Sequence, residues 1–226
     1  MNLPPSPRTG PIRVLVVDDH PIVRQGLAQL INREPDMLVC GEAEDARAAM
    51  DAIPESKPDI LLLDLSLKGP DGIELLKVLR SMESDLPVLM LSMHDESFYA
   101  ERALRAGANG YIMKQEASER VLIAIRQILA GEVYVSSRMA QKLVNQFIGS
   151  SGATKRSAIE ELTDRELEVF RLIGQGFGTR QIAEQLHLSV KTVETHHAHI
   201  KVKLSLRSAR ELVQHAVQCV TERRPL

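Results

Sequence analysis

Five polar residues in the first half of the chain stand at or just after the end of a short apolar run: Asp18, Asp19, Asp64, Ser92 and Lys114. Three carboxylates repel one another unless a cation joins them, and their hard oxygens suit Mg²⁺ with retained waters. That ion and a lysine ammonium would stabilise a phosphoryl group while one carboxylate acts as the nucleophile. Each residue alone could be a turn former or a helix cap, but that interpretation does not account for all five.

The elements that must position these residues follow from an alternation of apolar runs with amphipathic helical patterns. Strands are predicted over 12–17, 37–43, 60–64, 87–92 and 110–113, and helices from about 22 and over 46–53, 72–81, 96–106 and 118–130. Strands rich in Val, Ile and Leu on both faces imply a parallel sheet covered by helices on each side. Right-handed crossovers make it a doubly wound α/β domain, whose ligand site lies beyond the carboxyl ends of the strands.

The second half of the chain is predicted to be entirely helical. Thr163 and Glu166 form a capping box at the start of one helix, and a short helix over 179–186 follows. Ser189 caps a longer helix over 190–204, and Ser208 caps a last one that ends near Cys219. Two helices joined by a tight turn indicate a helix-turn-helix, although a helical hairpin without a DNA role has the same pattern.

Charge divides the chain in the same way. Residues 12–134 hold 13 Lys and Arg against 21 Asp and Glu, a net charge of −8, whereas residues 155–226 hold 12 against 9, a net charge of +3. An acidic half joined to a basic half suits a regulatory module tethered to a domain that binds a polyanion. A short helix over 137–147 and a stretch of glycine and small polar residues indicate a linker between them.

Composition excludes several classes of function. Aromatic residues make up 3% of the chain, too few for a platform that stacks single-stranded nucleic acid. No apolar run reaches the roughly 18 residues of a membrane span, and residues 1–11 lack the apolar region of a secretory signal. Cys40 and Cys219 lack metal or redox spacing, so we expect buried thiols in a reducing cytoplasm.

Three segments carry a resemblance to a known family. These are Val-Val-Asp18-Asp19-His20-Pro21, Leu62-Leu63-Asp64-Leu-Ser66-Leu and Gly107-Ala-Asn-Gly110-Tyr111-Ile-Met-Lys114. Together they resemble response-regulator receivers of the NarL/FixJ type, which implies a flavodoxin-like five-stranded fold. Lys68 and Gln115 stand where this family frequently has proline, and neither change removes a catalytic group.

The resemblance implies a role for each residue of the site. Asp64 would accept phosphate from a histidine kinase, while Asp18, Asp19 and the Ser66 carbonyl would help to hold Mg²⁺. Lys114 would contact the phosphoryl oxygens. Ser92 and Tyr111 would form a switch, in which the hydroxyl moves toward the phosphate and the aromatic ring turns inward. His20 is expected to be a turn or loop residue.

The second half resembles the LuxR-type helix-turn-helix, through Leu162-Thr163-Asp-Arg165-Glu166-Leu-Glu-Val and Leu188-Ser189-Val-Lys191-Thr192-Val193-Glu194-Thr195-His196. The resemblance implies that 190–204 enters the major groove with Val193, Ile200 and Leu204 facing inward. Base-reading positions would be Glu194, Thr195 and Ala198, and Glu194 could accept from a cytosine amino group. Candidate phosphate contacts are Thr179, Arg180, Lys191, Thr192, Lys201 and Lys203. A dimer surface is expected at Leu212, Val213, Ala216 and Val217.

The domains expected from these resemblances are a disordered tail over 1–11, a receiver over 12–133, a linker with a short helix over 134–159 and a DNA-binding domain over 160–226. The leading hypothesis is a transcription factor that binds promoter DNA as a homodimer when Asp64 is phosphorylated. The alternative is a DNA-binding regulator whose receiver answers to a ligand or partner instead. A third hypothesis is an enzyme, an aspartate-nucleophile phosphatase. Such an enzyme would need a second aspartate where Ser66 stands, so the sequence argues against it.

Overall fold

The computed structural model describes residues 10–67, 71–93, 96–149, 158–186 and 188–223. Contacts divide the chain into two compact units that part between Phe147 and Ile148. Most of the predicted tail and residues 150–157 of the predicted linker lie outside the described residues.

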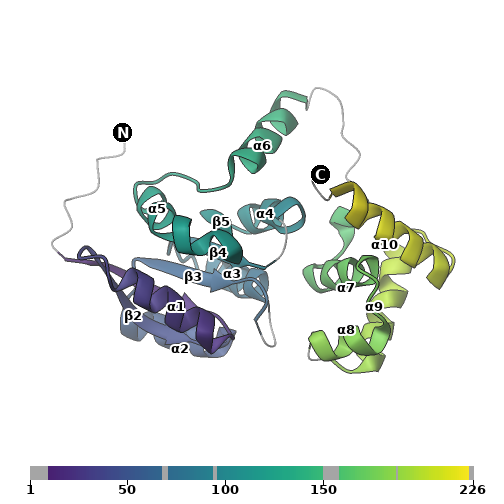
Figure 1. Cartoon of the computed structure of the whole chain (residues 1–226), viewed down its shortest axis with the longest axis horizontal. Coiled ribbons are helices and arrows are strands. Elements are labelled where there is room, and N and C mark those ends of the chain that lie inside the picture. The colour runs from purple at the N-terminus through teal and green to yellow at the C-terminus, as the bar shows by residue number, and fades with distance from the viewer. Residues whose placement is uncertain (1–9, 68–70, 94–95, 150–157, 187, 224–226) are drawn as a thin grey trace. The chain divides into compact units, whose positions relative to one another are not determined.

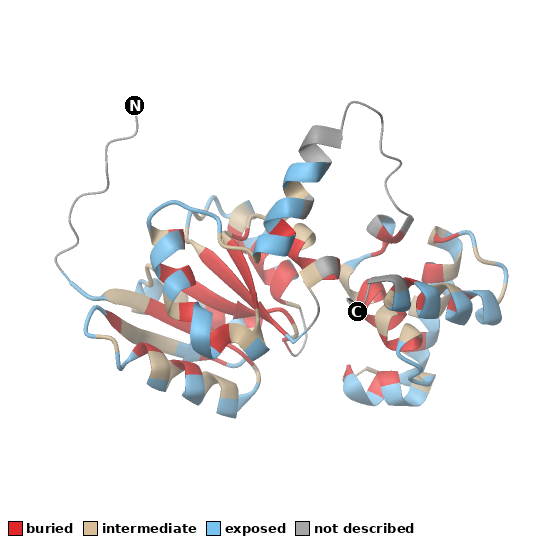
Figure 2. Cartoon of the chain, turned by 45° about the horizontal axis from the view of Figure 1, so that its top comes forward, coloured by how far each residue is buried: buried red, intermediate tan, exposed pale blue. Residues whose placement is uncertain are grey.

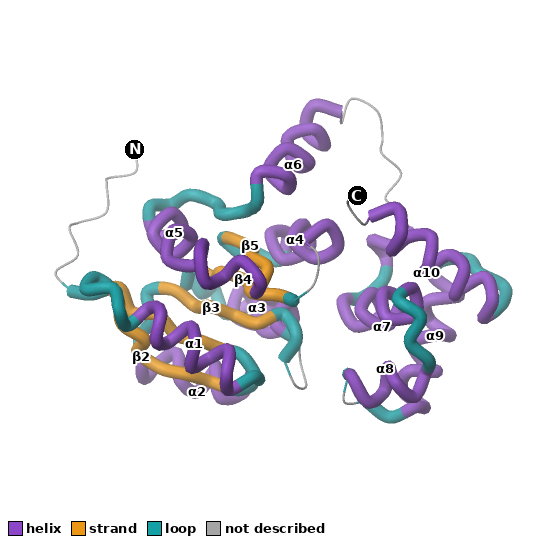
Figure 3. The backbone as a smooth tube through the Cα atoms, in the orientation of Figure 1, coloured by secondary structure: helices purple, strands orange, loops and turns teal. Residues whose placement is uncertain are grey.

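The first unit is built on a five-stranded parallel sheet, which confirms the predicted fold class (Figure 3). The strands are β1 (Ile12–Val17), β2 (Met37–Ala43), β3 (Ile60–Asp64), β4 (Val88–Ser92) and β5 (Gly110–Met113). Their order across the sheet is β2-β1-β3-β4-β5, so β1, β3, β4 and β5 are successive neighbours. β4 begins one residue later than predicted, at Val88, because Pro87 has no N–H to donate to a ladder.

Helices cover both faces of this sheet. They are α1 (Pro21–Ile31), α2 (Ala46–Ser56), α3 (Gly72–Ser81), α4 (Glu96–Arg105) and α5 (Ala117–Leu129), with a 3₁₀ turn over Lys114–Glu116 before α5. Figure 1 shows α1 and α5 over one face and α3 on the other. α2 runs three residues past the predicted end and contains Pro54, and Lys57 closes it in the left-handed conformation.

The alternation of side chains along the strands explains why both faces must be covered. Val14, Val16, Leu62 and Leu89 belong to one core cluster with Leu27 of α1 and residues of α5. Leu15, Val17, Leu61 and Leu63, which alternate with that first set, are also fully buried. Figure 2 shows the resulting buried centre of the sheet.

One further helix, α6 (Ser137–Gly149), follows the sheet domain at the position predicted for the short linker helix. The Ser136 hydroxyl caps it by accepting from the Met139 N–H at 3.1 Å and donates to Glu96 Oε1 of α4 at 2.6 Å. Met139 is 1% exposed, so the first turn of α6 packs into the core of this unit.

The second unit is helical throughout its described residues, as predicted. It comprises a 3₁₀ turn over Ala158–Glu161 and helices α7 (Asp164–Gly174), α8 (Thr179–Gln185), α9 (Val190–Lys203) and α10 (Ala209–Arg223). α7 and α10 approach each other closely at Gly174. A Cβ added at this residue would lie 2.5 Å from the Ala216 carbonyl oxygen. A side chain at Gly174 would therefore force the two helices apart.

The helix contacts correct part of the predicted dimer surface. Leu212 is 2% exposed and Ala216 is fully buried, because this side of α10 packs into the core of the unit. Val213 and Val217 are 48% and 42% exposed, so they alone of the four could take part in a dimer contact. Among the described residues, no helix is both long enough and apolar enough to span a membrane.

Candidate functional site

The ends of four neighbouring strands bring together the polar residues that the sequence singles out. Asp18 follows β1, Asp64 ends β3, Ser92 ends β4 and Lys114 follows β5. Because these strands are parallel, their carboxyl ends meet at one edge of the sheet. The Lys114 ammonium lies 2.6 Å from Asp18 Oδ2 and 2.8 Å from Asp64 Oδ2. One cation therefore bridges two carboxylates that are 0% and 1% exposed.

The backbone around Asp64 is held close to the start of α3. The Gly72 N–H donates to the Leu65 carbonyl at 2.9 Å, and a Cβ added at Gly72 would lie 2.2 Å from the Asp64 carbonyl oxygen. Only glycine fits so close to that backbone. This contact fixes the segment that carries Asp64 at the end of β3.

Asp18 is held by its neighbours in sequence. Its Oδ1 accepts from the His20 N–H at 2.9 Å, and its carbonyl oxygen accepts from the Arg24 guanidinium at 2.5 Å. Arg24 lies on α1, so the helix that follows β1 also orients the acidic turn between them.

Burial and the nearby Lys114 ammonium shift the pKa of Asp64 in opposite directions. Burial raises the pKa of Asp64 from 3.8 to about 6, against the effect of the nearby Lys114 ammonium, which lowers it, while the Asp18 carboxylate adds to the rise. At neutral pH the carboxyl group is thus mostly ionised, but its charge is poorly stabilised. A further cation at this position would favour the ionised form.

The donor set suits a metal ion. Asp18, Asp19, His20 and Asp64 each offer a ligand atom, and these atoms all lie within 4.8 Å of one another. Three carboxylates against the single Lys114 ammonium leave the group negative, and hard carboxylate oxygens are what Mg²⁺ prefers. These residues therefore fit a divalent cation. The Ser66 carbonyl remains a prediction as a ligand.

His20 is the residue of this site that sequence reasoning missed. It lies in the loop before α1, as expected, but the sequence did not indicate that its Nδ1 lies 2.6 Å from Asp19 Oδ1. The His20 side chain is 64% exposed and that of Asp19 is 9% exposed, so His20 lies on the solvent side of this contact. The only signal in the sequence is that it follows directly after the two aspartates.

Ser92 and Tyr111 lie on the same face of the sheet. Ser92 is in register with Met113, and Tyr111 is two residues before Met113 on β5, so the two side chains project to the same side. Tyr111 is 2% exposed and Ser92 is fully buried. The tyrosine ring is therefore enclosed within the domain in this structure. Their role as a switch remains a prediction.

In the second unit, α8 and α9 form the predicted helix-turn-helix. The Ser189 hydroxyl caps α9 by accepting from the Thr192 N–H at 3.0 Å, and Val193, Ile200 and Leu204 are buried as expected. The far end of α9 is tied to α7, because the Lys203 ammonium lies 2.6 Å from Glu166 Oε2. Lys203, proposed as a phosphate contact, therefore already pairs with a carboxylate.

Glu166 was predicted only as a member of the capping box, which is present with Thr163. Burial opposes its ionisation, but hydrogen bonds from Lys203 and Thr163 outweigh that effect and lower the pKa of Glu166. The pairing with Lys203 joins residues 37 positions apart. No local pattern could have indicated it.

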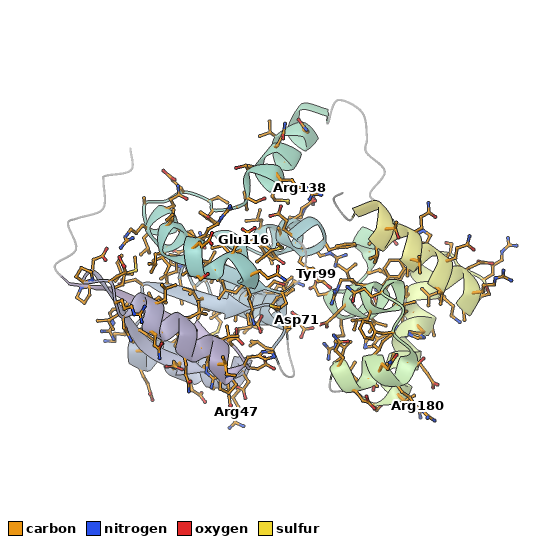
Figure 4. The ribbon with its side chains drawn as sticks, in the orientation of Figure 1. Arg47, Asp71, Tyr99, Glu116, Arg138 and Arg180 are labelled. Carbon is orange, nitrogen blue, oxygen red and sulfur yellow. The ribbon has the colours of Figure 1, made fainter. Side chains whose placement is uncertain are left out.

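The remaining residues proposed to contact DNA lie at the surface of this unit. The exposed ones are Arg180, Lys191, Glu194, Thr195 and Ala198, and the partly buried ones are Thr179, Thr192 and Lys201. Figure 4 shows Arg180 projecting from α8. Their contacts with DNA remain predictions.

Comparison with known proteins matches both units to family models. Residues 14–126 match the response regulator receiver domain, and residues 160–216 match the bacterial regulatory proteins of the luxR family. The oxygen regulatory protein NreC of Staphylococcus aureus is 39% identical over 211 residues, which cover 92% of this chain and 97% of that protein.

Solved structures agree with these matches. A LuxR-family two-component response regulator from Aurantimonas is 39% identical and covers 62% of this chain and 99% of its own, with a TM-score of 0.57. RcsB from Salmonella enterica serovar Typhimurium, bound to promoter rprA in the presence of the phosphomimetic BeF3-, is 26% identical. That match covers 92% of this chain and 99% of RcsB, with a TM-score of 0.60.

Proposed function

This chain belongs to the two-component response regulators that join a receiver domain to a LuxR-type DNA-binding domain, and we propose that phosphorylation of Asp64 sets its affinity for promoter DNA. Proteins of this family are transcription regulators and not classical enzymes. The chemistry at Asp64 would therefore modify only the chain itself. The observation that carries the proposal is the buried contact of Lys114 with both Asp18 and Asp64.

The residues of the pocket would divide the reaction among them. An ionised Asp64 oxygen would attack the phosphorus of a phosphohistidine on a histidine kinase, so that an acyl phosphate forms while the P–N bond breaks and the imidazole leaves. With a small phosphodonor such as acetyl phosphate, a P–O bond would break and acetate would leave. The Lys114 ammonium, which contacts the carboxylate beforehand, would then also stabilise negative charge on the phosphoryl oxygens. Asp18, Asp19 and the Ser66 carbonyl, with Asp64 itself, would hold Mg²⁺. The metal ion would neutralise charge that develops on the phosphoryl group.

His20 would serve the same site from its exposed side. Its Nδ1 contact with Asp19 orients that carboxylate, in the way that an outer partner fixes a ligand of a metal. We assign His20 to this positioning role, because its side chain lies at the solvent edge of the acidic group.

The negative charge of the phosphoryl group on Asp64 would affect the rest of the molecule by changing the position of the Ser92 side chain. Its hydroxyl would move toward the phosphoryl group, and Tyr111 on the same face would follow. We propose that this shift favours a homodimer, with Val213 and Val217 as the exposed apolar residues of α10 available for that contact. Two-fold symmetry would match paired half-sites in a promoter.

The DNA-binding unit would place α9 in the major groove. Thr179, Arg180, Lys191, Thr192 and Lys201 would contact phosphates, which position the protein without specifying sequence. Lys203 could join them only by leaving Glu166. A regulator of promoters acts where the DNA is, which we take to be the cytoplasm.

The decisive test is phosphorylation of the full-length protein by acetyl phosphate with Mg²⁺, followed by intact mass spectrometry. We expect one added phosphoryl group on the wild type and on Asp51→Asn, a change of an exposed carboxylate on α2, and none on Asp64→Asn. Labelling of Asp64→Asn would place the acceptor elsewhere. No labelling of any of the proteins, even with a histidine kinase as donor, would favour a receiver that answers to a ligand or partner.

A further inference from the structure

The outward face of α9 is fixed at both ends of the helix. Ser189 caps its start, Lys203 ties its end to Glu166, and Val193 and Ile200 are fully buried between them. At 100° per residue, Thr195 and Ala198 fall on the opposite side, with Glu194 beside them. All three are exposed.

Two residues of this face offer methyl groups. The Thr195 hydroxyl donates to the Lys191 carbonyl at 3.0 Å, so its hydrogen is already engaged within the helix. What Thr195 presents outward is therefore mainly its γ-methyl group. Ala198 presents only a methyl group. In the major groove, small apolar groups of this kind contact the 5-methyl of thymine.

Glu194 offers the opposite chemistry. Its side chain is exposed, and its charge also acts on the partly buried His197 imidazole on the same helix. A carboxylate accepts hydrogen bonds and cannot donate them, and phosphates repel it. The major-groove edge of cytosine presents an amino donor, whereas on adenine the amino donor stands beside the N7 acceptor, which repels a carboxylate.

The spacing of these residues suits direct base reading. Lys191, Glu194, Thr195 and Ala198 stand at i, i+3, i+4 and i+7, the spacing of the base-reading residues on a homeodomain recognition helix. From Glu194 to Ala198 the helix rises roughly 6 Å, about two base steps along one strand. The groups that they contact must therefore lie within a few consecutive base pairs.

We propose that this protein recognises duplex DNA in which a cytosine amino group, read by Glu194, lies within a few base pairs of thymine methyl groups, read by Thr195 and Ala198. The inference rests on the proposed function in one respect, that α9 enters the major groove. It goes beyond that function by naming the base edges that the helix selects.

The test is selection of binding sites from random duplex DNA by the full-length protein treated with acetyl phosphate and Mg²⁺. We expect the wild type to enrich a cytosine close to thymines. Glu194→Gln should replace that cytosine preference by adenine, because glutamine donates to N7 and accepts from N6. The preference between the two bases should change by roughly 5- to 150-fold.

Glu184→Gln is the matched control. It removes the same charge from an exposed position on α8, outside the reading face. It should keep the cytosine preference, even if the loss of a negative charge strengthens binding to all DNA. An equal loss of cytosine preference in Glu184→Gln would overturn the role of Glu194.

Deoxyuridine tests the methyl contacts, because it differs from thymidine only by the missing methyl group. Each replacement at a selected thymine should weaken binding about fourfold. Wild-type and Glu194→Gln proteins that select the same sites would overturn the inference and leave the DNA-binding function intact. If no protein enriches any sequence, the proposed function fails, and the inference with it.

Discussion

Asp64 combines two properties that oppose each other. It is 1% exposed, and burial raises its pKa to about 6, yet a nucleophilic carboxylate must be ionised. The Lys114 contact at 2.8 Å reduces this conflict without removing it. A buried carboxylate that is poorly stabilised by its protein neighbours gains from any further cation that approaches it. Because the charge of Asp64 is poorly stabilised in the folded state, it must also lower the free energy of unfolding of the receiver.

Replacement of Asp64 by asparagine should stabilise the receiver at neutral pH. The pKa is higher in the folded state than the ordinary 3.8, so between about pH 4 and pH 6 the folded protein holds more protons than the unfolded one. Stability therefore falls as the pH rises through this range. Asp64→Asn should raise the free energy of unfolding by roughly 1–3 kcal/mol at pH 7.5 and by less at pH 5.

Chemical denaturation in metal-free buffer at the two pH values measures this effect. Asp51→Asn, at an exposed position, should leave the free energy of unfolding unchanged at both. An Asp64→Asn protein that is less stable than the wild type at pH 7.5 would mean that the Lys114 ion pair outweighs the burial of the charge.

At the scale of elements, polar contacts add to the apolar packing that attaches the helices. Lys203 and Glu166 fasten α9 to α7, and Ser136 fastens the start of α6 to Glu96 in the first turn of α4. α4 begins four residues after Ser92.

Loss of the Ser136 hydroxyl should loosen α6. Ser136→Ala removes both the cap on the Met139 N–H and the bond to Glu96, and loss of a cap costs about 1 kcal/mol. Amide hydrogen exchange in α6 should become several-fold faster, while α5 keeps its protection. The neighbouring exposed Ser137, changed to alanine, should have little effect. Equal rates in wild-type and Ser136→Ala proteins would show that the buried Met139 alone holds the helix.

For the whole molecule, the chain joins two units with separate cores and opposite charge. The residues around the receiver sheet carry a net charge of −8, and those from 155 onward carry +3. Each unit buries its own apolar residues, so each should fold without the other. Phosphorylation of the receiver therefore need not rebuild the core of either unit to change DNA binding.

A fragment from Lys155 to the end of the chain should be helical and should bind duplex DNA without a phosphodonor. Its affinity, measured by fluorescence anisotropy, should fall as salt rises, because binding a polyanion releases counterions. Acetyl phosphate should change the affinity of the full-length protein and leave that of the fragment unchanged. A folded fragment that binds no DNA would refute the assignment of α8 and α9 as a DNA-binding pair.

The sequence by itself determined the order and type of the elements, because apolar periodicity is a local property. β1, β2, β3 and β5 and helix α3 have their predicted bounds. Asp18, Asp64, Ser92 and Lys114 could also be placed together from the sequence, since parallel strands carry their ends to one edge. The differences are small and local, such as the extension of α2 through Pro54.

Only the tertiary structure decided which side chains meet across elements. Leu212 and Ala216 are buried within the unit and are not exposed at a dimer surface, and Lys203 pairs with Glu166. It also brought Ser136 to Glu96. These outcomes depend on how helices cross and which of their faces turn inward. A pattern within one helix shows that an apolar face exists, but the packing of the neighbouring helices selects what covers it.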